Sequence, residues 1–187
     1  MPAPAEFETL PWFLYHPDPV GTGSVVRRDT PCKVCGKARG YIYVGPVYGR
    51  EDLDEAICPW CIADGSARKQ FGVEFMDRQS IGGGNWDTVP PAVVDSIAWH
   101  TPGFAGWQQE RWFTHCNDAA LFLGPAGRAE LESYGADLVR DILQESGVAE
   151  ADQEFYLSSM DKDRGPVTAY VFRCRHCGRL GGYSDCH

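Results

Sequence analysis

The sequence has no long apolar run and few basic side chains. No stretch of its 187 residues reaches the roughly 18 consecutive apolar residues that a membrane-spanning helix needs. Lysine and arginine number 17 against 26 aspartates and glutamates, which gives a formal net charge of −9. Affinity for a nucleic-acid backbone comes from basic side chains that displace counterions. The charge therefore argues against direct nucleic-acid binding and favours a basic protein partner.

The N-terminus lacks the features of a secretory signal. Residues 1–8 contain no positively charged segment, no apolar segment and no small-residue cleavage site. We therefore expect a cytoplasmic protein. Because cytosolic reductants keep thiols free, the eight cysteines of the chain are more often metal ligands or catalytic thiols than disulfides.

Motifs of the common enzyme classes are also absent. The chain contains no G-x-x-x-x-G-K-[ST] loop and no H-E-x-x-H, G-x-S-x-G or G-x-G-x-x-G sequence. We interpret His16 and His100 as hydrogen-bonded structural residues rather than catalytic bases. The sequence therefore predicts a protein that is not an enzyme.

The spacing of apolar and turn-forming residues predicts an α+β fold, because the strands and helices do not alternate in βαβ units. We expect a treble-clef or zinc-ribbon-like N-terminal module and a second small α+β module. The expected elements are a strand, turn and strand over 41–48, helices over 62–71, 91–99 and 127–145, and strands over 111–114 and 167–172.

A glycine run followed by two prolines is the best linker candidate in the chain. This stretch predicts a division into an N-terminal arm with a Cys₄ zinc module over 1–81, a linker over 82–91, and an α+β module with the second cysteine cluster over 92–187.

Three Cys-x-x-Cys pairs dominate the cysteine pattern, and the first two suit one zinc site. Two residues between cysteines let a tight turn point both sulfurs at one ion, and two such turns complete a tetrahedron. Gly36 follows Cys35 directly, and glycine tolerates the positive φ of such a turn. The alternatives are a redox dithiol at Cys58 and Cys61, or buried unconnected thiols.

The third pair, Cys174 and Cys177, needs ligands from elsewhere in the chain. Cys116, preceded by His115, is the first candidate, and the fourth ligand is His115, Cys186 or His187. Whether these residues form a second zinc site or are structural thiols stays open at this point. The candidate metal ligands are thus Cys32, Cys35, Cys58, Cys61, Cys116, Cys174 and Cys177. A site closed by four protein ligands has no position for water or substrate, so the zinc would be structural.

Acidic side chains concentrate in residues 128–164, which hold ten acids and four bases, a local balance of −6. Such a run is usually the solvated face of a helix. The alternative is a recognition surface that attracts a cationic protein. The candidate partner-binding residues are Glu130, Glu132, Asp137, Asp141 and Glu145.

Four segments resemble the CbrC family of bacterial proteins: residues 10–19, 58–67, 101–110 and 172–178. The blocks Cys-Pro-Trp-Cys-Ile-Ala-Asp-Gly-Ser and Thr-Pro-Gly through Gly-Trp-Gln-Gln are long enough to be specific. The resemblance implies that the paired cysteines and His115-Cys116 belong to a shared pattern. It also implies a link to tolerance of a nuclease colicin. Residues 184–187 depart from the family pattern, which puts Cys186 in doubt as a ligand.

Composition, cysteine pattern and resemblance together favour a non-enzymatic zinc-binding protein that binds another protein. The partner we expect is a basic nuclease toxin domain, which an immunity-like protein would neutralise. One alternative is a zinc-dependent or dithiol enzyme centred on Cys58 and Cys61. The other is a nucleic-acid-binding zinc module.

Overall fold

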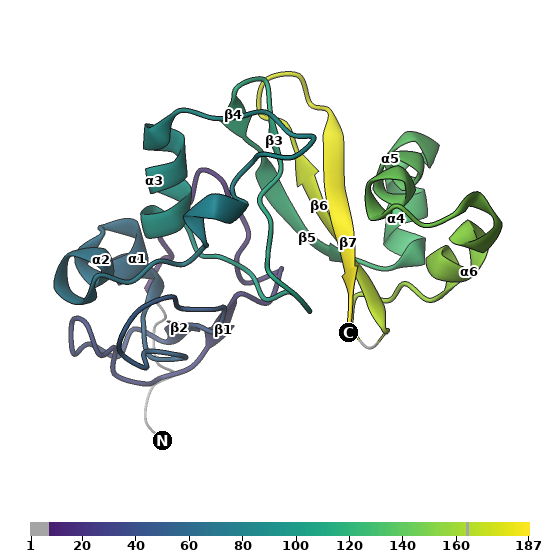
Figure 1. Cartoon of the computed structure of the whole chain (residues 1–187). Coiled ribbons are helices and arrows are strands. Elements are labelled where there is room, and N and C mark those ends of the chain that lie inside the picture. The colour runs from purple at the N-terminus through teal and green to yellow at the C-terminus, as the bar shows by residue number, and fades with distance from the viewer. Residues whose placement is uncertain (1–7, 164) are drawn as a thin grey trace. The chain divides into compact units, whose positions relative to one another are not determined.

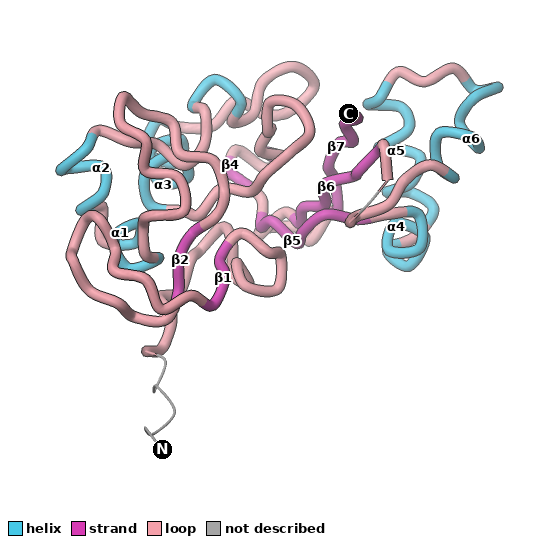
Figure 2. Tube along the Cα trace, turned by 90° about the horizontal axis from the view of Figure 1, so that it is seen from below, coloured by secondary structure: helices cyan, strands magenta, loops and turns pink. Residues whose placement is uncertain are grey.

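A computed structural model describes residues 8–163 and 165–187 of the chain. These residues form two compact units, which Figures 1 and 2 trace by element. The first unit comprises the chain up to Arg78 together with Pro91–Ala105, and the second comprises Gln79–Pro90 and Gly106–His187. Among the described residues, no helix is long and apolar enough to cross a membrane.

The division differs from the expected one around residues 79–105. The helix α3 (Pro91–His100) packs in the first unit, where its Ala98 carbonyl accepts a hydrogen bond from the backbone N–H of Phe75. Residues 79–90 belong instead to the second unit, because Ser80 and Gly82 exchange backbone hydrogen bonds with Trp112. The Gly/Pro-rich stretch 82–91 is thus shared between the two units.

The first unit is built from short elements around a buried core. The strands β1 and β2 pair antiparallel, with Val25 opposite Tyr43. Its core includes Phe13, Ile42, Ile57 and Ile62, all at most 2% exposed. The elements are β1 (Val25–Arg27), β2 (Tyr41–Tyr43), α1 (Pro59–Ala63), α2 (Ser66–Phe71) and α3 (Pro91–His100), and a single 3₁₀ turn, η1 (Arg78–Ser80), follows the first stretch of this unit.

The expected hairpin over 41–48 is wrong. The strand β2 pairs with β1 and bridges to Ile57, whereas Tyr48 forms its bridge with Glu74. All three residues of β2 are buried, so partners far along the chain cover them better than the adjacent residues would. Local turn residues indicate where a strand ends, but burial decides which strand it pairs with.

Two expected helices are each interrupted by a glycine with positive φ. The stretch expected to form one helix over 62–71 instead contains the last residues of α1 and the whole of α2. The helix α2 begins after Gly65, whose φ is 73°. The helix expected over 127–145 is divided into α4 (Arg128–Tyr134) and α5 (Ala136–Ser146) by Gly135, whose φ is 111°. Glycine adopts such angles at little steric cost, so these positions are natural breaks. The helix over 91–99 is confirmed as α3.

The second unit contains a three-stranded antiparallel sheet in the order β5-β6-β7 and a separate hairpin of β3 and β4. The strand expected over 167–172 is confirmed as β6, whereas only Thr114 of the strand expected over 111–114 lies in a strand, β3. The α+β class is therefore confirmed. The elements are β3 (Thr114–His115), β4 (Asp118–Ala119), β5 (Leu121–Ala126), α4 (Arg128–Tyr134), α5 (Ala136–Ser146), η2 (Glu150–Asp152), α6 (Gln153–Ser158), β6 (Val167–Arg173) and β7 (Leu180–Cys186).

The amphipathic helices close one core of this second unit. Leu131 of α4 and Leu138 and Ile142 of α5 pack with Ala169 and Val171 of β6, and all five are at most 3% exposed. These helical positions repeat with the period of an α-helix, as the sequence predicts. These apolar residues stay on the same side of α4 and α5 across the break at Gly135. The apolar pattern alone therefore does not reveal that the helix is divided.

Candidate metal centres

The first two Cys-x-x-Cys pairs meet inside the first unit. Cys32 and Cys35 flank a tight turn, Cys58 lies immediately before α1, and Cys61 lies within α1. Pro59 occupies the first turn of this helix, where its missing N–H costs no hydrogen bond. The sequence thus places one sulfur pair on a turn and the other at a helix start.

The spacing of these four sulfurs is that of a tetrahedral metal site. The Sγ–Sγ distances are 3.8 Å for Cys32–Cys61, 3.8 Å for Cys35–Cys58 and 3.6 Å for Cys58–Cys61. A tetrahedron with metal–sulfur bonds of about 2.3 Å has edges of about 3.8 Å. A disulfide would instead require about 2.0 Å. The four cysteines therefore form a cluster that could bind a metal ion.

Backbone N–H groups and burial surround the sulfur of Cys32. The N–H of Val34 and the N–H of Cys58 lie 3.4 and 3.2 Å from it. Cys32, Cys58 and Cys61 are at most 3% exposed. N–H donors stabilise negative charge on a sulfur, and the apolar surroundings exclude water. The site therefore stabilises thiolates only when a positive charge lies beside them.

The pKa values of the cluster separate in the way expected for crowded thiols. The side-chain hydrogen bond with Cys58 and the backbone N–H groups lower the pKa of Cys32 to about 4. The same hydrogen bond and burial raise the pKa of Cys58, and burial raises the pKa of Cys61 to about 12. The sulfurs thus cannot all ionise on their own. A divalent cation would hold them as thiolates, because metal binding displaces their protons.

The third pair meets His115 and Cys116 in the second unit. Cys174 and Cys177 lie on the turn between β6 and β7, and His115 and Cys116 lie at the tip of the β3–β4 hairpin. The ligand atoms of these four residues all lie within 4.8 Å of one another. The second candidate metal centre thus has one imidazole and three thiols.

A left-handed turn lets two adjacent residues contribute to this site. His115 pairs with Asp118, and the two residues between them, Cys116 and Asn117, have φ values of 56° and 57°. Two consecutive left-handed residues are characteristic of a type I′ hairpin. The reversal brings Cys116 Sγ to 3.2 Å from His115 Nδ1, and Cys177 Sγ lies 3.4 Å from the same nitrogen. These separations are close to the roughly 3.5 Å expected between nitrogen and sulfur ligands of one tetrahedral zinc.

The turns at 32–35 and 174–177 share one backbone pattern. Gly36 N–H donates to the carbonyl of Cys32, and Gly178 N–H donates to the carbonyl of Cys174, over 2.7 and 3.0 Å. Both glycines have positive φ, at 70° and 76°, as predicted for Gly36. The two turns therefore have the same backbone geometry, repeated once in each unit.

An acidic residue that sequence reasoning missed ties the second site together. Asp118 is 8% exposed and accepts hydrogen bonds from Arg175 over 2.6 Å and from His176 Nε2 over 2.9 Å. It lies on the β3–β4 hairpin, whereas both partners lie inside the Cys174–Cys177 turn. The two loops are thus joined by side chains as well as by the cysteines. Asp118 lies two residues after Cys116 in the sequence. It reaches the Cys174–Cys177 turn only because the β3–β4 hairpin folds back toward that turn.

The other predicted fourth ligands lie away from this site. Cys186 pairs with Val167 at the end of β7 remote from the turn, and Arg173 pairs with Leu180 beside the turn. Leu180 and Cys186 are six positions apart along β7, a distance of about 20 Å. His187 packs against the ring of Trp107. Of the three predicted alternatives, the structure brings only His115 to the cysteines.

The five predicted partner-binding acids all form ion pairs within the second unit. Asp137 and Asp141 lie 2.9 and 3.1 Å from guanidinium nitrogens of Arg140 and Arg179. The complete set of pairs is Glu130 with Lys162, Glu132 with Arg128, Asp137 with Arg140, Asp141 with Arg179, and Glu145 with Arg111. Much of the charge on this face is therefore balanced locally. Arg164, counted among the bases of this stretch, lies outside the described residues.

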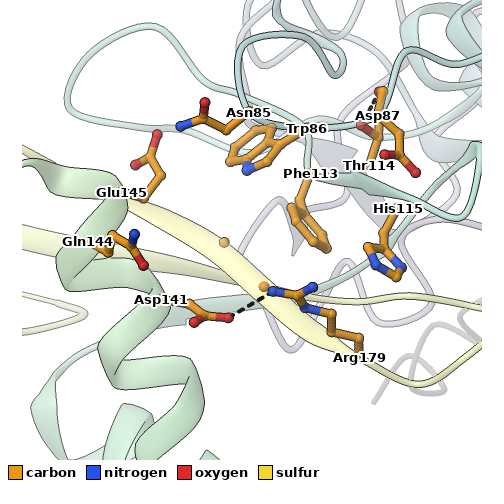
Figure 3. A pocket seen from close by; sticks show the side chains of 12 residues that line it. Asn85, Trp86, Asp87, Phe113, Thr114, His115, Asp141, Gln144, Glu145 and Arg179 are labelled. Carbon is orange, nitrogen blue, oxygen red and sulfur yellow. Dashed lines mark hydrogen bonds and ion pairs between the residues drawn. The ribbon is translucent and has the colours of Figure 1, made fainter.

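A cavity of about 410 Å³ opens beside the second cluster. Figure 3 shows its aromatic wall of Trp86, Phe113 and His115, with Arg179 reaching toward Asp141 across from it. Trp86 and Phe113 meet edge to face, with their ring centroids 5.4 Å apart. All lining residues belong to the second unit. The imidazole of the metal cluster is thus part of a cavity wall.

Comparison with known proteins extends along almost the whole chain. A family model described as an uncharacterised protein family, UPF0167, matches residues 10–186. A Mycobacterium bovis protein named UPF0167 protein Mb2317 is 44% identical over 183 residues, covering 95% of this chain and 94% of its own length. The Pseudomonas aeruginosa UPF0167 protein PA1536 is 38% identical over 179 residues, covering 91% and 93%. No solved structure matches the chain.

These matches correct the resemblance inferred from the sequence. The expected family was CbrC, but the matching model and the relatives carry the name UPF0167 instead. The colicin link that the CbrC resemblance implied is withdrawn with it. The model match and the identity over nearly the full length show that this chain belongs to the UPF0167 family.

Proposed function

We propose that the protein binds two zinc ions, one in each unit, and does not use them for catalysis. The observation that carries the proposal is the tetrahedral spacing of the sulfurs of Cys32, Cys35, Cys58 and Cys61. The His115, Cys116, Cys174 and Cys177 cluster supports a second ion with the same arrangement of a knuckle and a partner turn.

The donor atoms support zinc over other metals. Four thiolates, or three thiolates and one imidazole, suit tetrahedral Zn²⁺, whereas calcium and magnesium require oxygen ligands. Bound zinc would crosslink distant parts of each unit. A knuckle combined with a second pair at the start of a helix also supports a treble-clef-like first site, although the expected hairpin between the two pairs is not formed.

The arrangement supports a protein that is not an enzyme. Each cluster offers four protein ligands and so leaves no place on the ion for water or substrate. A dithiol enzyme at Cys58 and Cys61 would need an accessible, low-pKa thiol. Both of these cysteines are buried, and both have raised pKa values. The negative net charge likewise weighs against a nucleic-acid-binding module.

Cytoplasmic location stays a prediction. Binding of a basic protein partner is the second part of the proposal. The support for partner binding is the net charge of −9 and the acidic surface of α4 and α5. The internal ion pairs of that surface reduce its support, since paired acids attract a partner less strongly. The narrower prediction of a nuclease toxin depended on the CbrC resemblance, so the partner is proposed only as a basic protein.

Metal stoichiometry tests the zinc proposal. We expect native mass spectrometry of the zinc-reconstituted chain to show two ions per molecule. Cys58→Ser should reduce the count to one, because serine is a poor zinc ligand. Cys186→Ser is the matched control and should keep both ions, because Cys186 lies outside both clusters. A reconstituted wild-type chain without bound metal would refute the proposal.

A further inference from the structure

The two clusters differ strongly in their access to solvent. In the first, Cys35 is exposed, but Cys32, Cys58 and Cys61 are buried in the hydrophobic core of the first unit. In the second, Cys174 is buried, but Cys116 and Cys177 are exposed. Without any opening of the core, a small chelator can therefore reach two thiols of the second cluster but only one of the first.

A cavity leads to the imidazole of the second cluster. His115 forms part of its wall, and Asp87, Asp141 and Glu145 line it as well. Carboxylates along an entry path raise the local concentration of cations. Asp141 and Glu145 are paired with Arg179 and Arg111, which moderates this attraction. The cavity thus places these carboxylates and the imidazole of His115 in one polar wall beside the second cluster.

The second cluster is also held in place by contacts that need no ion. Asp118 on the hairpin binds both Arg175 and His176 on the opposite turn. The turn itself is closed by backbone hydrogen bonds from Cys174 N–H to Arg179 and from Gly178 N–H to Cys174, over 2.8 and 3.0 Å. These contacts join the two ligand-bearing loops of the second cluster without an ion.

From these three observations we propose that the second site exchanges its zinc ion with solution while the protein stays folded, whereas the first site keeps its ion until the first unit unfolds. This inference rests on the proposed function, since it requires both sites to bind zinc. It assigns the two sites different roles: the Cys₄ site is structural, and the His-Cys₃ site takes up and releases metal.

Release of zinc into excess chelator tests this difference on the full-length, two-zinc protein. We expect one equivalent to leave at least about tenfold faster than the other, with unchanged far-ultraviolet circular dichroism during the fast phase. Alkylation by N-ethylmaleimide after that phase should newly label Cys116 and Cys177 but leave Cys32, Cys58 and Cys61 unlabelled. Cys186 is exposed outside both clusters, so its labelling before and after release is the internal reference.

Two variants connect the fast phase to the proposed residues. Cys177→Ser should abolish the fast phase and leave the slow equivalent bound. Asp118→Asn keeps the shape of the side chain but loses its charge, and should speed the fast phase roughly tenfold, because it weakens the charge-assisted hydrogen bonds to Arg175 and His176 that join the two loops. Asp137→Asn, on the exposed end of α5, is the matched control and should release zinc as the wild type does.

The outcomes separate this inference from the function on which it rests. A chain that takes up two zinc ions but releases both in one step, or only together with loss of helical signal, would overturn the inference alone. Labelling of Cys32, Cys58 or Cys61 in the fast phase would do the same. A chain that never takes up two equivalents would remove the proposed function and this inference together. The alkylation pattern of the wild type decides the matter even if a variant fails to fold.

Discussion

At the scale of single residues, the environment rather than the residue type decides the chemistry. His16 shows this away from the metal clusters. It is fully buried in the first unit, with Nδ1 2.7 Å from the carbonyl of Pro102 and Nε2 2.6 Å from the hydroxyl of Thr22. Nδ1–H donates to the carbonyl and Nε2 accepts from the hydroxyl, so the site suits a neutral ring. Burial lowers the pKa of His16 to about 4.

This lowered pKa predicts a pH dependence of stability. Between pH 6.5 and about 4 the unfolded chain protonates His16 but the folded chain does not. The free energy of unfolding should therefore fall as the pH decreases through this window, by up to about 3 kcal/mol. His16→Gln, measured by urea unfolding at the same zinc concentration, should remove that part of the slope. Equal slopes of the free energy of unfolding against pH for wild type and His16→Gln would contradict the lowered pKa of His16. Acid release of zinc affects both proteins alike and therefore does not explain a difference between them.

At the scale of elements, glycines follow the last residues of α2, α4 and α5. Gly135 separates α4 from α5 with φ 111° and ψ 159°, and a Cβ added there would meet no atom within 4 Å. The constraint at this position is thus backbone conformation and not crowding. The periodic apolar residues on either side would fit one continuous helix equally well. Only the backbone angles of the folded unit distinguish the two arrangements.

Gly135→Ala separates the divided helix from a continuous one. In a continuous helix, alanine would stabilise the protein by about 1 kcal/mol. At the backbone angles of Gly135, which are almost confined to glycine, an L-residue should instead destabilise it by about 1–3 kcal/mol, which urea unfolding can measure. Gln144→Ala, on the exposed side of α5, is the control and should change the free energy of unfolding by less than about 0.5 kcal/mol. A stabilised Gly135→Ala protein would show that the break at Gly135 is not required.

At the scale of the whole molecule, each of the two units has its own core and its own candidate metal centre. The first core includes three of the four cysteines of its cluster, among them Cys58 and Cys61. The second core is built by α4, α5, α6 and the three-stranded sheet, and its cluster lies on the turns of two hairpins. Loss of one metal ion should therefore affect mainly the unit that holds it.

Hydrogen exchange of Cys58→Ser tests this independence. We expect loss of amide protection over β1, β2 and α1, because a site whose ligands are part of the core contributes directly to folding. Protection in β6 and β7 should stay within about threefold of wild type, since their hydrogen bonds do not depend on that ion. Cys186→Ser should leave both units protected. Parallel loss of protection in both units would instead show one cooperative fold.

The sequence by itself determined that this is an α+β protein whose six paired cysteines, with Cys116, are the main candidate ligands. Cys-x-x-Cys spacing and a following glycine are local features, and the knuckles depend on them alone. The tertiary structure decided what depends on contacts between distant segments: the pairing of β2 with β1, the choice of His115 over Cys186 or His187, and the Asp118 contacts with Arg175 and His176. These contacts join residues far apart in the chain, so no local pattern specifies them, and burial and backbone geometry select them only in the folded protein.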